Sequence, residues 1–196
     1  MQKPNITRAG NPVLRAVAAE VAPGELGSKA LVELVSKMVE AMRAAPGVGL
    51  AAPQLGVSKR VIVVEDTEAR MSKLSSKDRS TRGRVTLPLL VVVNPDLTLI
   101  GDKTATFFEG CLSVPSYMAL VERALEVRVR GTNEHGDPVD LTVSGWPARI
   151  FQHEVDHLDG MLYVDRMLTR SFGDDGEVVQ RWMHLPTDEV RTLLDT

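Results

Sequence analysis

The stretch WPARIFQHEVDHLDG, residues 146–160, contains the pattern His153-Glu154-x-x-His157, and the interpretation of the chain starts from it. Pro147 favours the first turn of a helix and the final glycine favours its end, so the stretch predicts a helix. Residues four apart lie one above the other on a helix, and both imidazoles can therefore face a single cation. Glu154 would lie beside that cation and could take a proton from its bound water.

This pattern needs a third protein ligand, because a catalytic metal usually takes three and leaves one position for water. Downstream, Tyr163 stands where a histidine would extend the motif, and Glu177, 20 residues after His157, lies in a turn-like stretch. Upstream, the single cysteine is Cys111, and its neighbour Gly110 would let backbone approach a ligand. The residues alone leave Glu177 and Cys111 open as the third ligand and favour Cys111.

The remaining composition is typical of a soluble globular protein. The chain has 196 residues, of which 43% are hydrophobic and 25% charged, with one cysteine and a formal charge of −3. One cysteine excludes an internal disulfide and Cys-only metal sites, and the charge gives no reason to expect specific DNA binding. The sequence contains neither the apolar core of a signal peptide nor an apolar run long enough to cross a bilayer. We therefore expect a cytoplasmic protein that does not span a membrane.

The hydrophobic pattern predicts an α+β fold in which mixed or antiparallel sheets pack around the metal-binding helix, in one domain over residues 1–196. Apolar residues three and four apart predict a helix over residues 25–45, ended by Pro46 and Gly47. A weaker helix is predicted from Thr187, as its cap, to the C-terminus. Valine-rich or alternating runs predict strands at residues 60–65, 89–94, 98–100 and 105–108, and a hairpin of residues 125–130 with 139–143.

One segment, residues 67–84, differs from the rest in charge. It holds six basic and two acidic residues, a net charge of +4 that leaves −7 for the remainder. The favoured interpretation is a mobile, solvated loop between two strands, and the alternative is contact with an anionic surface such as ribosomal RNA. The tail, residues 166–196, carries no motif.

Three separated motifs resemble those of the peptide deformylase family. They are Gly47-Val-Gly-Leu-Ala-Ala-Pro-Gln54, then Glu109-Gly-Cys-Leu-Ser113, and finally the His153 to His157 motif, in the order of the family. The likeness extends roughly from residue 11 to residue 165. The basic segment looks longer than the common connection at that place, and the tail matches nothing in the family.

The resemblance implies that Cys111, His153 and His157 are the ligands of one divalent metal ion and that Glu154 is the general base and acid. It also implies Fe²⁺ as the working ion, with Zn²⁺, Ni²⁺ or Co²⁺ possible in a preparation. Two imidazoles and one thiolate leave the ion with a charge of +1, which a bound hydroxide would neutralise.

The implied reaction is hydrolysis of the N-formyl group from the formylmethionine of newly synthesised polypeptides, which releases formate when metal-bound water attacks the formyl carbon. The Gln54 amide and the Leu112 backbone N–H would donate to the developing oxyanion. Val48, Gly49 and Gly110 would offer backbone groups to the nascent peptide, docked as an added strand. Association with the ribosome is a further expectation.

Two other functions compete with this hypothesis. One is an endopeptidase with the same His-Glu-x-x-His motif, and the other is a non-catalytic metal-binding or ribosome-binding module. Phe107, Trp146 and Ile150 are candidates for an apolar slot that receives the methionine side chain, although each is at least as well explained as a core residue.

Overall fold

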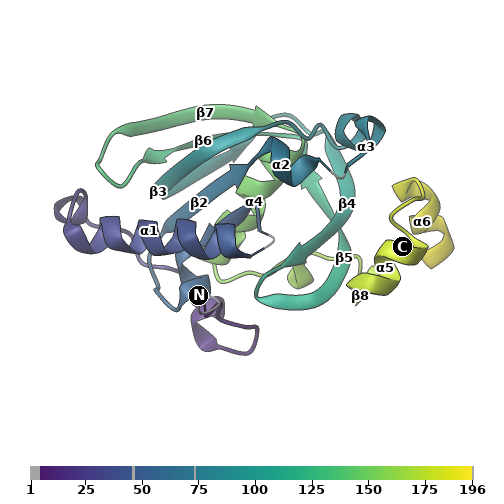
Figure 1. Cartoon of the computed structure of the whole chain (residues 1–196), viewed down its shortest axis with the longest axis horizontal. Coiled ribbons are helices and arrows are strands. Elements are labelled where there is room, and N and C mark those ends of the chain that lie inside the picture. The colour runs from purple at the N-terminus through teal and green to yellow at the C-terminus, as the bar shows by residue number, and fades with distance from the viewer. Residues whose placement is uncertain (1–4, 46, 73, 196) are drawn as a thin grey trace.

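The computed structural model describes residues 5–45, 47–72 and 74–195, and Figure 1 shows its elements. Pro46 and Lys73, used above as a helix end and a basic residue, lie outside these residues, as do residues 1–4 and 196. The elements are α1 (Lys29–Ala44), β1 (Gly49–Ala51), β2 (Val61–Asp66), α2 (Glu68–Met71), α3 (Ser76–Thr81), β3 (Leu87–Leu99), β4 (Thr104–Cys111), β5 (Val114–Ala124), β6 (Glu126–Thr132), β7 (Pro138–Ser144), α4 (Trp146–Leu158), β8 (Gly173–Asp174), α5 (Asp175–Arg181) and α6 (Thr187–Leu194).

The strands form two antiparallel sheets, which confirms the predicted α+β class. The larger sheet has the order β1-β2-β3-β6-β7, and the smaller has the order β4-β5-β8. Within the larger sheet, β6 pairs with β7 across residues 133–137, so the predicted hairpin is confirmed. The helix α4 contacts strands of both sheets, and α5 and α6 lie beyond the smaller sheet (Figure 1).

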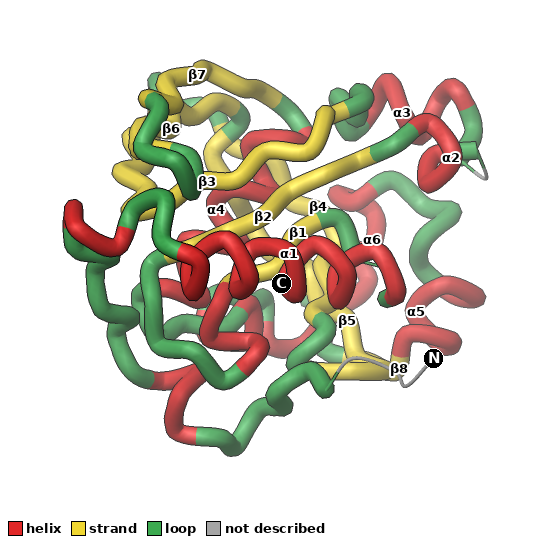
Figure 2. The backbone as a smooth tube through the Cα atoms, turned by 60° about the vertical axis from the view of Figure 1, so that its left-hand side comes forward, coloured by secondary structure: helices red, strands yellow, loops and turns green. Residues whose placement is uncertain are grey.

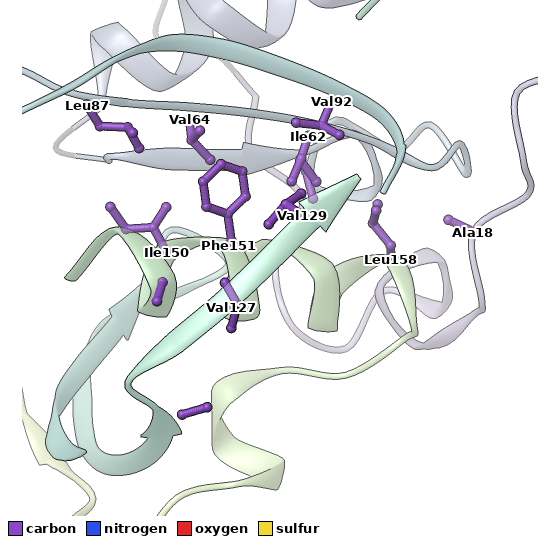
Figure 3. Packing of buried hydrophobic residues seen from close by; sticks show 13 residues of the cluster. Ala18, Ile62, Val64, Leu87, Val92, Val127, Val129, Ile150, Phe151 and Leu158 are labelled. Atoms are coloured by element: carbon purple, nitrogen blue, oxygen red, sulfur yellow. The ribbon is translucent and has the colours of Figure 1, made fainter. Parts of the chain in front are cut away.

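The interior strand β2 has its side chains buried on both faces of the larger sheet. Val61 and Val63 pack with α1, whereas Ile62 and Val64 point to the opposite face, because side chains alternate along a strand. Figure 2 shows α1 crossing in front of β1 and β2. On the other face, Phe151 of α4 fills the space beside Ile62 and Val64 (Figure 3). The sheet therefore holds α4 through its core rather than through surface contacts.

The strand β3 joins two strands that the sequence pattern separates. Residues 89–94 and 98–100 were predicted as distinct strands, but the chain continues from one to the other with a shift of register between Val93 and Asp96. Asn94 at this shift has φ +50°, and its amide exchanges two 2.9 Å hydrogen bonds with the Val21 backbone. Asparagine is common in turns because it tolerates a positive φ. The sequence therefore suggests the end of a strand at a place where the strand only bends.

Several other predictions need correction. The first helix begins at Lys29 rather than at residue 25, because the Ser28 hydroxyl accepts the Leu31 N–H at 3.3 Å and caps it. The strand β5 was missed, since Pro115 and Ser116, which has φ +65°, interrupt its alternation. Residues 173–177 are β8 and the start of α5 rather than a turn. Finally, α6 begins at Thr187, which is inside the helix and does not cap it.

The described part of the basic segment, residues 67–72 and 74–84, contains two short helices where the sequence predicts a loop. It forms α2 and α3, and Arg79 makes two hydrogen bonds with Glu68, at 2.6 and 2.9 Å. The Arg84 guanidinium donates to the carboxylate of Asp66 at 2.7 Å. Arg70 donates to backbone carbonyls at the end of α1. Much of the positive charge in this segment is therefore used within the protein.

The tail packs on the smaller sheet through a small apolar cluster. Val178 of α5 and Val190 of α6 are buried against Phe108 and Leu120. Among the described helices, none combines the length and the apolar character needed to cross a membrane.

The start of α4 depends on a close backbone contact. Gly145, the residue before the helix, has φ +67°, and a Cβ atom there would lie 2.6 Å from the carbonyl oxygen of Gly83. The same oxygen accepts the Trp146 N–H at 3.3 Å, which satisfies one of the N–H groups left free at a helix start. Gly83, near the end of the basic segment, thus caps the N-terminus of α4.

We predict that Gly145→Ala is much more destabilising than Gly101→Ala. Gly101 has nearly the same φ, +66°, but nothing lies within 4 Å of a Cβ built there. The unfavourable φ alone should cost about 1 kcal/mol at Gly101, and the added backbone clash should bring Gly145→Ala to about 3 kcal/mol or more. Urea unfolding of both variants measures the difference, and equal losses would show that the contact is unimportant.

Candidate metal centre

The end of β4 and the middle of α4 bring three ligand residues together. The ligand atoms of Cys111, His153 and His157 all lie within 4.8 Å of one another. The Cys111 Sγ lies 3.2 Å from the His157 Nε2. Sulfur and nitrogen ligands of one tetrahedral cation lie roughly 3.5 Å apart, so small side-chain adjustments would accommodate an ion. The structure therefore brings together the three residues that the sequence selected and forms a Cys/His/His metal site.

The charges in this cluster also suit a cation. Burial raises the pKa of Cys111, but the neighbouring His157 and His153 outweigh it and lower the pKa of the thiol well below its usual value. Burial lowers the pKa of His153, whereas its hydrogen bonds with Cys111 and Glu109 hold it well above the usual value. A divalent ion would replace the proton on His153 and bind the thiolate directly.

Glu109 fixes the orientation of His153. The His153 Nδ1 lies 3.0 Å from the Glu109 Oε2, so the other ring nitrogen is directed at the ligand cluster. Arg123 donates to both Glu109 oxygens at 3.0 Å, and Arg149 donates to Oε1 at 2.6 Å. Burial raises the pKa of Glu109, but His153 and Arg123 prevail and hold it well below the usual carboxyl range. Glu109 is thus a buried carboxylate with three cationic or donor partners.

A second acidic residue supports this arrangement from the next turn of α4. Asp156 accepts from Arg123, and Arg166 donates to both of its oxygens at 2.8 Å. Sequence reasoning quoted Glu109 and Asp156 within motifs but gave them no role. Their positions close to ligand residues in the sequence could have indicated a supporting role. Nothing in the sequence distinguishes Arg123 and Arg149 from surface arginines.

Glu154 lies beside the ligands in a nearly inaccessible position. Its side chain is 4% exposed, and its Oε2 has no hydrogen-bond partner among the described residues. Burial raises the pKa of Glu154 from 4.5 to about 7. A Cβ atom at Gly49 would come within 2.2 Å of the Glu154 Oε1, so β1 can approach this carboxylate only as glycine. A buried carboxyl with an unused oxygen is suited to proton transfer.

The amide of Gln54 has a defined orientation. Its Oε1 accepts the Ala51 N–H at 2.9 Å, which places the amide nitrogen on the opposite side. That nitrogen lies 3.2 Å from the Ser113 Oγ and 3.6 Å from the Cys111 Sγ. Leu112 follows Cys111 in the turn between β4 and β5. The structure therefore directs an amide donor from Gln54 at the ligand cluster.

The residues expected to dock a peptide lie on two sheet edges. Gly49 belongs to β1, an edge strand of the larger sheet, and Gly110 belongs to β4, an edge strand of the smaller sheet. Val48 precedes β1, but its carbonyl already accepts the Glu65 N–H at 2.9 Å. One of the two backbone groups expected from Val48 is therefore used within the protein.

The structure places the remaining residues considered from the sequence in different environments. Phe107 and Trp146 have ring centroids 6.3 Å apart, and Ile150 is buried in the core cluster of α4. Tyr163, considered only as a missing histidine, has its ring centroid 6.4 Å from that of His153 and nearly parallel to it. Glu177 pairs with Arg181 on the exposed face of α5 and takes no part in the ligand cluster.

Comparison with known proteins agrees with this site. A family model described as polypeptide deformylase matches residues 3–172. The chain is 48% identical over 169 residues to peptide deformylase 1A, chloroplastic, of Solanum lycopersicum, covering 86% of this chain and 61% of that protein. It is 48% identical over 184 residues to peptide deformylase 3 of Streptomyces avermitilis, covering 94% of this chain and 80% of that protein.

A solved structure is also similar. It is the Met-Ala-Ser bound class I type b peptide deformylase from Acinetobacter baumannii, with a TM-score of 0.73 and 37% identity over 83% of this chain and 96% of that one. The chain spans 61% of the Solanum relative and 63% of a second plant relative, from Arabidopsis thaliana.

We predict that Glu109→Gln weakens both the fold and the metal site. The change removes the charge that compensates buried Arg123 and Arg149, at a cost of about 3–5 kcal/mol in unfolding free energy. It also weakens the orientation of His153, which should lower metal affinity by about 10–100-fold. Urea unfolding of metal-free protein and competition with a chelator measure the two effects. Asp140→Asn, which breaks the exposed pair with Arg128, is the control and should change neither; a Glu109→Gln variant equal to it would contradict the assignment.

Proposed function

Because the chain belongs to the polypeptide deformylase family, we propose that it hydrolyses the N-formyl group of N-formylmethionyl peptides and releases formate. The observation that carries this proposal is the unpartnered Glu154 carboxyl oxygen beside a Cys/His/His ligand set. We further propose that residues 1–196 act as one catalytic domain. The chain spans 61% and 63% of its two plant relatives, so the experiment that tests this function uses the chain itself.

Cys111, His153 and His157 would hold one divalent ion. When bound, the ion would polarise the formyl group and activate a water molecule for attack. The ligand set of one sulfur and two nitrogens suits Zn²⁺ by geometry, whereas the assignment of Fe²⁺ rests on the family resemblance, with Ni²⁺ and Co²⁺ as substitutes. If Fe²⁺ is the working ion, activity falls in air through oxidation of the iron and of Cys111.

Glu154 would move the proton. Its unused Oε2 would accept a proton from the attacking water and deliver it to the nitrogen of the leaving amine as the C–N bond breaks. Burial is the largest cause that raises its pKa to about 7, so this carboxyl would be able to accept and release a proton near neutral pH. The oxygen from water ends in formate, and the peptide leaves with a free amino group.

Two donors would stabilise the oxyanion that forms on the formyl group. The Gln54 amide nitrogen is already directed at the cluster, because the Ala51 N–H holds its oxygen. The Leu112 backbone N–H, next in sequence to Cys111, would be the second donor. Donors fixed in place before reaction require no reorganisation as the charge develops.

An extended peptide would dock between the edges of β1 and β4. Gly49 and Gly110, with the N–H of Val48, would supply the backbone groups, and the peptide would add a strand to these edges. The Acinetobacter baumannii relative was solved with Met-Ala-Ser bound, a peptide that begins with methionine. We propose that the same class of peptide is the substrate here.

The competing functions are less consistent with the structure. An endopeptidase with a downstream glutamate ligand would need Glu177 near the histidines, but Glu177 is exposed on α5 and pairs with Arg181. A closed structural metal site has no use for a buried, unpartnered carboxyl oxygen such as that of Glu154.

Ribosome association and a cytoplasmic location stay predictions. The relatives reported above include a chloroplast protein and a bacterial one. Since Arg70, Arg79 and Arg84 are engaged within the protein, a contact through the basic segment would depend on exposed groups such as Lys77. Co-sedimentation with ribosomes at low salt, compared between the parent and Lys77→Glu, tests it.

We predict that anaerobically prepared, Fe²⁺-loaded protein releases formate from a formyl-Met-Ala-Ser peptide. Glu154→Ala should keep its metal but lose at least about 10²-fold in rate, the usual scale for a general base. Cys111→Ala should lose bound metal, measured by elemental analysis after gel filtration.

Glu177→Ala is the matched control for Glu154→Ala and should retain both metal and activity. An inactive parent that is fully metal-loaded would overturn the deformylase proposal. A Cys111→Ala variant with full metal content would overturn only the ligand assignment.

A further inference from the structure

Two aromatic rings and two arginines form a cluster at the N-terminal end of α4. We call Phe107, Trp146, Arg82 and Arg149 the ring cluster. The Arg82 guanidinium lies 5.7 Å from the Phe107 centroid and 5.3 Å from the Trp146 centroid. Arg149 lies 5.2 and 5.7 Å from the same two centroids. Both rings therefore lie within cation–π distance of Arg82 and Arg149, and the Trp146 ring has a third guanidinium, that of Arg84, 5.3 Å from its centroid.

The ring cluster continues the row of residues that builds the metal centre. Side chains alternate along β4, so Phe107 and Glu109 share one face. The register shifts after Gly110, and Cys111 lies beyond this shift in the ligand cluster. Arg149 lies one turn before His153 on α4 and donates to Glu109. With increasing distance from the ligand cluster, the row continues with Glu109 and Arg149 and ends with the two rings.

Arg82 reaches the rings from the basic segment. The next residue, Gly83, accepts the Trp146 N–H, and Arg84 is paired with Asp66, so the backbone around Arg82 is held at both sides. Burial lowers the pKa of Arg82, and no carboxylate among the described residues forms an ion pair with it. The ion pairs of the segment are Arg79–Glu68 and Arg84–Asp66, whereas the Arg82 guanidinium contacts the two rings and the Met183 sulfur.

By helix geometry alone, the start of α4 lies about one methionine side chain from the metal ligands. Trp146 is seven residues before His153, which is about 10 Å along a helix axis. The contact radius of a ring removes roughly 3.5 Å from this distance, which leaves about 7 Å. An extended methionine side chain, measured from the formyl carbon, has about this length.

We propose that Arg82 is a positioning residue that holds Phe107 and Trp146 in place and thereby limits the length of the first substrate side chain. This inference rests on the proposed function. A planar guanidinium over both rings restrains their movement away from the metal centre. Without it, Trp146 keeps only the contacts with Arg84 and Arg149, whose guanidinium groups are held by Asp66 and Glu109, and the ring gains room to move. The basic segment would then contribute to substrate selection instead of binding RNA.

The test uses formylated tripeptides whose first residue has a side chain of graded length. Norvaline is shorter than methionine by one heavy atom, norleucine matches it, and 2-aminoheptanoic acid is longer by one. For Arg82→Ala, kcat/KM for the longest substrate should rise about tenfold relative to formyl-Met, through KM, because one methylene in a tight pocket is worth about 10-fold or more. The kcat for formyl-Met should stay within about threefold, since Arg82 does not touch the reacting atoms.

Arg79→Ala is the matched control, because Arg79 belongs to the same segment and pairs with exposed Glu68. It should leave the length preference unchanged. If Arg82→Ala does not fold, Arg82→Lys replaces it and should shift the preference about threefold in the same direction, since an ammonium lacks the planar group. A preference within twofold of the parent, or an equal loss on all substrates, would overturn the inference.

A second measurement does not depend on activity. In a Trp182→Phe background, Trp146 is the remaining tryptophan of the chain. Its emission should shift to longer wavelength in Arg82→Ala as the ring becomes hydrated, and an unchanged spectrum would count against the inference. A metal-loaded parent that is inactive on formyl-Met would refute the proposed function instead, so the two failures are distinguishable.

Discussion

The rest of the site depends on one buried carboxylate. Glu109, which is 5% exposed, accepts hydrogen bonds from Arg123 and Arg149 and orients His153. A charge in this position is tolerable only because its partners are fixed, and the partners are themselves buried charges that would be costly alone. Arg123 comes from β5 and Arg149 from α4, so the same interaction joins the smaller sheet to the central helix. The same electrostatic unit therefore orients a metal ligand and joins the smaller sheet to α4.

Most of the residues expected to contact the metal or the substrate could be predicted from the sequence. The spacing of His153 and His157 is diagnostic on a helix, and Cys111 is the chain's one cysteine. The family resemblance supplied Gln54, whose orientation the structure then explained through Ala51. What escaped prediction was the support behind these groups. Arginine is common and usually exposed, and only the three-dimensional fold shows which guanidinium is buried against which carboxylate.

The fold itself was predicted where local pattern and tertiary environment agree. The alternation in β6 and β7 identified the hairpin, and Pro147 identified the start of α4. The errors occurred where single residues imitate a break, as at Asn94 in the bent strand β3. In the basic segment, residues 67–84, the helices α2 and α3 were missed. The ion pairs of Arg79 and Arg84 could not be predicted, because a charged residue in a sequence does not show which partner it will meet.

The two ends of α4 have a consequence for the order in which the molecule assembles. The helix start is closed by Gly83, and at its end Gly160 lies so close to Arg15 that a Cβ atom there would be 2.7 Å from the Arg15 carbonyl oxygen. Both contacts join residues far apart in the chain, and such contacts form late because long loops must first be ordered. The histidines therefore have their final geometry only when distant parts of the chain have come together, which couples the metal centre to the closure of two long loops.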